Sequence, residues 1–300
     1  MGVDLIPPKT CTYDCLYCEV GRTTCHTIDA GPLVPLNELL KELKLVLRKN
    51  QPDTITLAGS GEPTLNSEID RIISSIKEMT AVKTALLTNG SLFWNDEILQ
   101  KVLDADIILP TLSTAFEETH NKIHRPCQGL NLSRIIGGIK QLRKRYQGLM
   151  FLEVVLLSGI NDTEREIEGL KTVINEISPD KIQLNTIIRP PSDLRAIPVD
   201  MTRMNQIKDF LGDKAEIIAY RPSDKKTTEY DSGSLSIIEM SRRRPVRLVD
   251  IADALNMPLE EAGRLIKGML IKGDISKREH EGEIFYVARQ HSNEVYSITK

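Results

Sequence analysis

The stretch TITLAGSGEPT, residues 54–64, joins a short apolar run to a turn that contains two glycines. Residues 54–58 predict a β-strand, because threonine, isoleucine and leucine suit a buried pleated strand. Glycine and proline then end the strand. Apolar residues recur at helical spacing over residues 69–79. The order strand, turn, helix predicts an α/β unit.

The same order repeats along most of the chain. Strand-like runs lie at residues 3–6, 54–58, 82–87, 107–112, 151–157 and 182–188. Apolar strands that alternate with helices predict a parallel sheet covered by helices. Six units predict a partial (β/α)6 TIM-like barrel over residues 1–220, since a full barrel of eight units takes ~250 residues. A doubly wound open sheet is the competing topology, and periodicity does not separate the two.

A second, smaller domain follows. Residues 221–234 are polar and aperiodic, which predicts a linker. Residues 235–290 contain two short helical patterns around a turn at 256–258, then a hairpin pattern centred on Gly282. This order predicts a winged helix-turn-helix domain, followed by a tail at 291–300.

Composition limits the classes of protein. The 300 residues are 27% charged and 40% hydrophobic with a net charge of −3, as in an ordinary soluble protein. This excludes a protein whose whole surface is a polycation for nucleic acid. No apolar run is long enough to span a membrane, and the N-terminus lacks the pattern of a signal peptide. We therefore expect a cytoplasmic protein with no membrane partner.

Three of the five cysteines, Cys11, Cys15 and Cys18, lie within eight residues after the first predicted strand. Thiolates are soft ligands for zinc, copper(I) or iron–sulfur clusters. A cubane cluster normally takes four cysteines, so three leave one iron open for another ligand. The alternative is a zinc knuckle with Cys25 or His26 as fourth ligand. The loop follows a strand, where α/β barrels carry their catalytic face, and this position favours the cluster.

These residues carry a resemblance to a known family. The spacing Cys11-x3-Cys15-x2-Cys18, with Tyr17 before the last cysteine, resembles the signature of the radical S-adenosylmethionine (SAM) superfamily. Residues 59–64 resemble its glycine-rich "GGE" motif, and Thr88-Asn89-Gly90 ends the third predicted strand. The resemblance covers roughly residues 1–220.

A narrower resemblance rests on four short segments: PPKTC, YDC, GRTT and QLNT. They resemble a prokaryotic branch of iron–sulfur oxidoreductases grouped loosely with wyosine tRNA-base synthases and nitrogenase-cofactor maturation proteins. Members of that branch carry a short upstream segment, whereas this chain begins with Met1 inside the predicted first strand.

The resemblance implies that Cys11, Cys15 and Cys18 hold a [4Fe–4S] cluster whose open iron is chelated by SAM. Reductive cleavage of SAM would give a 5′-deoxyadenosyl radical that abstracts hydrogen from a substrate. The implied substrate classes are a tRNA base and a protein or peptide, contacted through the C-terminal domain. The implied reductant is a carrier such as ferredoxin or flavodoxin. No catalytic side chain is assigned.

Candidate SAM-binding residues lie at the ends of the predicted strands. They are Tyr17, Gly59, Ser60, Gly61, Glu62, Pro63, Asn89, Ser113 and Asn185. The glycines allow close approach of the backbone, Glu62 is a candidate acceptor for the SAM ammonium, and Pro63 stiffens the turn. Tyr17 is a candidate either for packing near the adenine or for shielding the cluster. Ser113 suits the ribose hydroxyls.

Several other polar residues have two interpretations each. Asn185 and Glu153 are expected to face the barrel interior, as ligand contacts or as satisfied polar groups. Arg125 suits either the SAM carboxylate or the protein surface. His120 and His124 have helical spacing but no obvious partner ligand, so solvated or structural roles are favoured. Cys25 and Cys127 are interpreted as free thiols, with no accessory cluster.

The competing hypothesis is an iron–sulfur-sensing, winged-helix DNA-binding regulator without turnover. Residues 235–290 hold 10 Lys and Arg against 9 Asp and Glu, a weak basic balance for DNA binding. A sensor also needs no SAM site, so the glycine–glutamate motif favours the enzyme. A zinc-binding structural protein is a remote third hypothesis.

Overall fold

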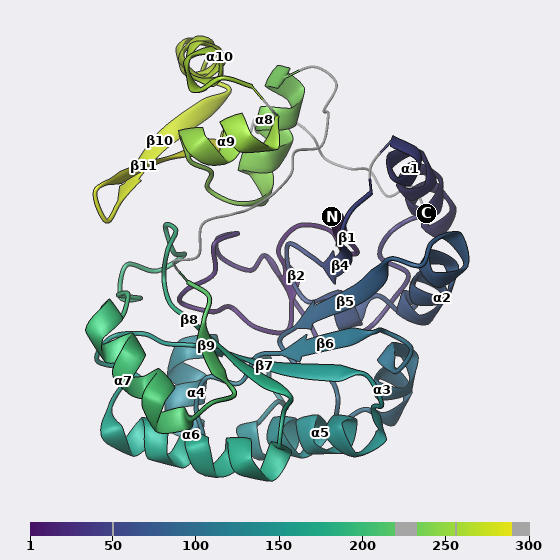
Figure 1. Cartoon of the computed structure of the whole chain (residues 1–300), viewed down its shortest axis with the longest axis vertical. Coiled ribbons are helices and arrows are strands. Elements are labelled where there is room, and N and C mark those ends of the chain that lie inside the picture. The colour runs from purple at the N-terminus through teal and green to yellow at the C-terminus, as the bar shows by residue number, and fades with distance from the viewer. Residues whose placement is uncertain (50, 220–232, 256, 290–300) are drawn as a thin grey trace. The chain divides into compact units, whose positions relative to one another are not determined.

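The chain forms two compact units, Met1–Pro222 and Ser223–Lys300. The computed structural model describes residues 1–49, 51–219, 233–255 and 257–289 (Figure 1). Each unit has its own cluster of buried apolar side chains.

Parallel strands form the central sheet of the first unit. Over the described residues these are β1 (Gly2–Asp4), β4 (Thr54–Ala58), β5 (Lys83–Thr88), β6 (Ile107–Pro110), β7 (Leu149–Val155), β8 (Lys181–Asn185) and β9 (Ala215–Ile217). The strand order in the sheet follows the chain from β1 to β9 without reversal. A doubly wound sheet reverses its order at a switch point, so that alternative is wrong. The α/β class with a parallel sheet is confirmed, and the order is consistent with a partial TIM-like barrel.

The strand count differs from the prediction. The described residues hold all six predicted strands, with ends shifted by up to three residues, and β9 adds a seventh. The sequence did not predict β9 because it has only three residues, too few for a periodic pattern. A separate pair of two-residue strands, β2 (Thr10–Cys11) and β3 (Cys25–His26), lies within the loop that follows β1.

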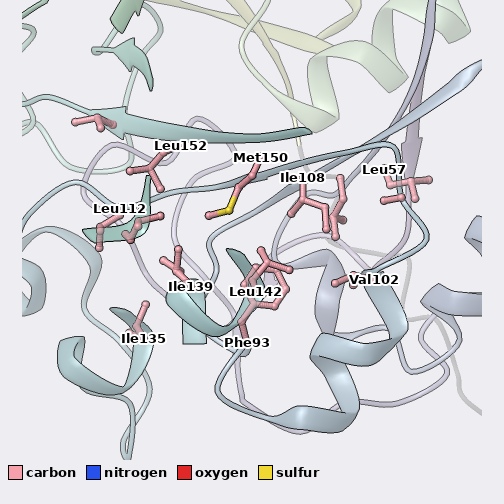
Figure 2. Close-up of a cluster of buried hydrophobic side chains, with 14 of the residues drawn as sticks. Leu57, Phe93, Val102, Ile108, Leu112, Ile135, Ile139, Leu142, Met150 and Leu152 are labelled. Atoms are coloured by element: carbon pink, nitrogen blue, oxygen red, sulfur yellow. The ribbon is translucent and has the colours of Figure 1, made fainter. Parts of the chain in front are cut away.

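Helices connect the strands and cover one face of the sheet. They are α1 (Leu36–Lys49), the 3-10 turn η1 (Pro63–Leu65), α2 (Ile69–Met79), α3 (Asp96–Val102), α4 (Glu117–His124), α5 (Leu132–Arg145), α6 (Glu164–Ile177) and α7 (Met201–Leu211). Figure 1 shows α2, α3, α5, α6 and α7 along one side of the sheet. Alternate side chains of β4, β6, β7 and β8 are buried, for example Met150, Leu152 and Val154 of β7. Figure 2 shows such strand residues grouped with Ile135, Ile139 and Leu142 of α5. The intervening positions of β7 and β8 are only partly buried, which leaves a second face of the sheet for polar side chains.

Two adjacent glycines of α5 give opposite stability predictions. A Cβ on Gly138 would lie 2.5 Å from the Trp94 backbone nitrogen, whereas a Cβ on Gly137 meets no atom within 4 Å. We expect Gly137→Ala to raise the free energy of unfolding by about 0.5–1 kcal/mol, because alanine is the better helix former. Gly138→Ala should lower it by about 1–3 kcal/mol through overpacking. Trp94 is the single tryptophan, so denaturation followed by its fluorescence reports on this unit; equal effects of the two variants would contradict the packing.

The second unit is a small helical core with a hairpin. It contains α8 (Gly233–Arg243), α9 (Leu248–Ala254), α10 (Leu259–Lys272) and the antiparallel strands β10 (Ile275–His280) and β11 (Glu283–Ala288). Val246 forms an isolated antiparallel bridge with Tyr286 of β11. The buried side chains include Ile237, Ile251 and Ile266, one from each helix.

The predicted linker ends too late in the sequence. Residues 233 and 234 begin α8, which the sequence analysis did not predict. Glycine and serine suggested a turn, yet both are also common where helices begin. The rest of the linker, 221–232, and the tail at 291–300 lie outside the described residues.

Candidate cofactor site

The three cysteines of the motif lie on one loop at the C-terminal end of β1. Cys11 ends β2, while Cys15 and Cys18 follow in an irregular segment, and all three are half-buried. Burial raises the pKa of Cys11 to about 12. Burial also raises the pKa of Cys15, and the neighbouring Cys11 and Cys18 raise it further. A metal cofactor therefore has to displace the protons of these thiols when it binds.

This donor set fits an iron–sulfur cluster better than a single zinc ion. In the described part of the chain, no three His, Cys, Asp or Glu side chains gather tightly enough to hold one metal ion. Cys25, a proposed fourth zinc ligand, is exposed, and His26 places Nε2 3.1 Å from the Thr12 carbonyl. A cubane cluster takes its thiolates at separate iron atoms. Three neighbouring but separated thiols match that requirement and leave one iron open.

The C-terminal end of α4 holds the cysteine loop on one side. The backbone N–H groups of Asp14 and Leu16 donate to the carbonyls of His124 and Ile123, each at 2.9 Å. The N–H of Cys127 donates to the Thr12 carbonyl at 2.9 Å. These bonds engage the backbone of Thr12, Asp14 and Leu16, so the loop is held on both sides of Cys15.

Two tyrosines and two histidines pack around Cys15. Tyr13, His120 and His124 are each about 2% exposed, so solvated histidines are excluded. Burial lowers the pKa of His120 to about 4 and moves the pKa of His124 well below its ordinary value. Both rings are therefore neutral near pH 7. The Tyr17 hydroxyl lies 3.4 Å from His124 Nδ1, and Tyr17 lowers the pKa of Cys15, against the larger effect of burial. This contact favours the cluster-shielding interpretation of Tyr17 over contact with adenine.

Arg125 links three loops rather than facing a ligand or solvent. Its Nη1 lies 3.3 Å from Asp14 Oδ2, and its Nη2 bonds Asp193, which lies in the segment after β8. Burial alone would raise the pKa of Asp14, but hydrogen bonds from Thr23 and Arg22 outweigh it and lower that pKa. Because both carboxylates already engage Arg125, the predicted pairing of this residue with the SAM carboxylate is not favoured.

The glycine-rich turn after β4 holds the cysteine loop on its other side. The Lys9 N–H donates to the Ser60 carbonyl at 2.6 Å, and the Glu62 N–H donates to the Thr10 carbonyl at 3.1 Å. A Cβ on Gly61 would lie 1.9 Å from the Thr10 carbonyl oxygen. The glycines were predicted to allow a close approach of the backbone. At Gly61 the segment that comes close is the cysteine loop, at Thr10. The Ser60 hydroxyl donates to Asp4 Oδ2 at 2.8 Å, which fastens the turn to β1.

Glu62 is buried and engaged by the protein. Its Oε1 accepts from the hydroxyls of Thr64 at 2.5 Å and Thr88 at 2.6 Å, and its Oε2 accepts from the Asn89 N–H at 2.7 Å. Burial raises the pKa of Glu62, and these hydrogen bonds act in the opposite direction. Glu62 thus joins the ends of β4 and β5. Pro63 begins η1, as expected for a residue that stiffens this turn.

Asn89 reaches the cysteine loop from the end of β5. Its Nδ2 donates to Thr12 Oγ1 at 2.7 Å and lies 3.6 Å from Cys11 Sγ. Of the candidate SAM contacts, Asn89, Tyr17 and the 59–62 turn therefore gather around the cysteines.

Ser113 and Asn185 belong to the other half of the sheet. Ser113 is buried, and its hydroxyl oxygen accepts from the Val155 N–H at 3.1 Å, which favours the satisfied-polar interpretation. Asn185 donates to Glu153 Oε1 at 3.2 Å, and Thr111 donates to Glu153 Oε2 at 2.7 Å. Glu153 raises the pKa of Tyr17, after the larger effects of burial and Cys15. This polar row thus extends toward the cysteine loop.

Sequence reasoning missed the segment after β8. The Ser192 hydroxyl donates to the Cys15 carbonyl at 2.7 Å, and the Asp193 N–H donates to the Leu16 carbonyl at 3.1 Å. The run Pro190-Pro191-Ser192-Asp193 is a turn signal after the last predicted strand. The carboxyl ends of parallel strands lie at the same edge of the sheet. The turn signal after the last predicted strand could therefore have placed residues 190–193 near the cysteine loop.

A parallel α/β sheet that presents three cysteines on the loop after its first strand defines the class: an enzyme fold built to hold a metal cofactor at the C-terminal edge of its strands. The family comparison agrees with this class. Residues 5–168 match the model of the Radical SAM superfamily, and the chain belongs to that superfamily. Its enzymes use a [4Fe–4S] cluster and SAM.

The chain is also similar to individual proteins and to solved structures. The chain is 26% identical over 294 residues to a UPF0026 protein of Methanocaldococcus jannaschii, covering 96% of this chain and 91% of that protein. It is 31% identical over 295 residues to a GTPase Obg of Brachyspira hyodysenteriae, covering 95% of this chain but only 43% of that protein. A radical SAM methyltransferase from Sphaerobacter thermophilus matches 74% of this chain and 67% of its own, with a TM-score of 0.58 and 15% identity, a likeness of fold. Among the described residues, no helix has the length and apolar character needed to cross a bilayer.

Proposed function

We propose that this chain uses Cys11, Cys15 and Cys18 to hold a [4Fe–4S] cluster and binds SAM beside it. The observation that carries the proposal is that three half-buried cysteines lie on one loop, which follows β1 at the edge where the parallel strands end. When bound, the cluster and SAM would supply reductive cleavage of SAM to a 5′-deoxyadenosyl radical, which abstracts hydrogen from a substrate. The competing DNA-binding sensor is not favoured, since it needs no SAM site.

The protein's own residues would orient the cofactor and exclude water. The 59–62 turn and the end of α4 fix the cysteine loop from two sides. With the Glu62 carboxylate engaged by Thr64, Thr88 and Asn89, we propose that backbone carbonyls of the 59–61 turn accept the SAM ammonium. The row of Thr111, Glu153 and Asn185 would then face SAM or substrate from the opposite strands.

The test is anaerobic reconstitution of the full chain with iron and sulfide, followed by reduction in the presence of SAM. We expect a cluster signal in electron paramagnetic resonance, SAM binding by calorimetry and formation of 5′-deoxyadenosine. A small carrier such as ferredoxin or flavodoxin would be the reductant in the cell, and dithionite serves in the assay. A reconstituted protein that binds no SAM would overturn the proposal.

For the second unit we propose a winged-helix module that presents the substrate. The three helices, the β10–β11 hairpin and the Val246–Tyr286 bridge support this interpretation. The exposed face of α10 carries Glu260 and Glu261 beside Arg264 and Lys267, and Ile271 is 79% exposed. Mixed charge with an exposed aliphatic side chain favours a protein or peptide substrate, because nucleic-acid surfaces show a clear basic footprint.

A tRNA base is the second candidate substrate, supported by the exposed run Arg242-Arg243-Arg244. Retention of tRNA by the full chain at increasing salt separates the two candidates. Contacts to phosphate weaken steeply as salt rises, so salt-dependent retention would favour tRNA. Absence of retention at low salt would exclude tRNA and leave the protein or peptide.

A further inference from the structure

A histidine from α4 lies against the sulfur of Cys15. His124, the last residue of α4, places Nδ1 3.3 Å from Cys15 Sγ. The two residues are 109 positions apart in the sequence. The same nitrogen lies 3.4 Å from the Tyr17 hydroxyl, so His124 contacts both Cys15 and Tyr17.

The chemistry of a metal-bound cysteine determines which ring nitrogen of His124 carries the proton. A thiolate that ligates iron carries no hydrogen and can only accept hydrogen bonds. The Tyr17 hydroxyl lies 3.4 Å from the same nitrogen of His124, Nδ1. An unprotonated Nδ1 would direct its lone pair at the thiolate, whereas a protonated Nδ1 would donate to it. The loaded site therefore selects the Nδ1–H tautomer of His124.

The ring of His124 is held in this orientation by its neighbours. Its centroid lies 5.0 Å from that of Tyr13, 5.7 Å from Tyr17 and 4.9 Å from His120. Its own carbonyl accepts from the Asp14 N–H, one residue before Cys15. Both the ring and the backbone of His124 are thus fixed to the loop whose sulfur they face.

We propose that His124 is a positioning residue that donates an Nδ1–H hydrogen bond to Cys15 and thereby raises the reduction potential of the cluster. The inference rests on the proposed cluster at Cys11, Cys15 and Cys18. Reduction adds one electron from an external donor, dithionite in the test, and forms or breaks no bond. The added negative charge spreads onto the cysteine sulfurs, so a donor at Cys15 stabilises the reduced state more than the oxidised one. Hydrogen bonds to cluster sulfurs are an established determinant of such potentials.

The test is a redox titration of the reconstituted full chain, monitored by the paramagnetic signal of the reduced cluster. We expect His124→Leu to lower the ratio of reduced to oxidised cluster about tenfold at a fixed potential, a shift of about 59 mV for one electron. His124→Asn should restore most of the ratio, because its side-chain amide N–H lies near the position of Nδ1. A lowered ratio in the leucine variant with rescue by asparagine supports the proposal.

His120→Leu is the matched control. His120 is equally buried, stacks against Tyr13 and His124, and leaves Nε2 without a hydrogen-bond partner. It should change the ratio much less than His124→Leu does, since His120 only packs against the His124 ring and donates nothing to a sulfur. A His124→Leu protein with the wild-type ratio, or an equal shift in His120→Leu, would overturn the role of His124 while leaving the cluster in place. Failure of the wild-type chain to assemble any cluster would instead overturn the proposed function, so the two failures are distinguishable.

Discussion

Cys15→Ala is expected to reduce the formation of 5′-deoxyadenosine to background in the reconstituted protein. Cys15 is the middle one of the three proposed ligands, and its sulfur lies 3.3 Å from His124 Nδ1. With two thiolates left, two of four irons would lack a protein ligand, and the cluster would not be retained. Iron content and paramagnetic resonance should therefore fall together with activity. A Cys15→Ala protein that still forms 5′-deoxyadenosine would contradict the assignment.

Cys25→Ala is the matched control for this variant. Cys25 lies on the same loop, in β3, but it is exposed and lies outside the Cys11-x3-Cys15-x2-Cys18 motif. We expect wild-type iron content and activity. Trp94 fluorescence during denaturation checks that both variants remain folded, because the single tryptophan lies in the first unit. Equal loss in both variants would restore Cys25 as a ligand and with it the zinc alternative.

Local sequence patterns predicted the features that depend on neighbouring residues. The cysteine spacing and the alternation of strands and helices are both visible within short stretches of the sequence. The structure places the three cysteines after β1 as expected. The glycines of the 59–64 segment were also identified as positions of close approach. Periodicity could not identify their partner, since Thr10 lies about fifty residues earlier in the chain.

Contacts between distant segments could not be predicted in the same way. Arg125 was assigned to a ligand or the surface because its partners, Asp14 and Asp193, come from two other loops. His124 had no visible partner for the same reason. Its partner Cys15 lies 109 positions away and meets it only when α4 packs beside the loop. Burial, which makes both histidines neutral, is a property of that packing rather than of the helical spacing.

Gly61→Ala is expected to displace the cysteine loop from the turn at residues 59–62. An alanine Cβ would lie 1.9 Å from the Thr10 oxygen and 2.7 Å from the Thr10 carbonyl carbon, both backbone atoms that no rotamer change can move. Relief requires the loop to move away from the turn, which breaks the bonds Lys9 N–H to Ser60 O and Glu62 N–H to Thr10 O. We expect a loss of about 3–5 kcal/mol in unfolding free energy, from overpacking of about 1–3 and roughly 1 for each of the two lost hydrogen bonds. Cluster loading should fall because Cys11 follows Thr10 directly.

Gly59→Ala separates this effect from a general intolerance of the turn. A Cβ on Gly59 would meet the Ile6 side chain, at 2.6 Å from Cγ1 and 2.8 Å from Cδ1. A side chain can change rotamer, so the cost should stay below that of Gly61→Ala, and the cysteine loop should keep its backbone hydrogen bonds. Denaturation followed by Trp94 fluorescence gives the stability of each variant, and iron content after reconstitution gives the loading. A Gly61→Ala protein that loads iron as well as Gly59→Ala would mean that the contact with Thr10 does not position Cys11, and the turn would then have to act on SAM instead.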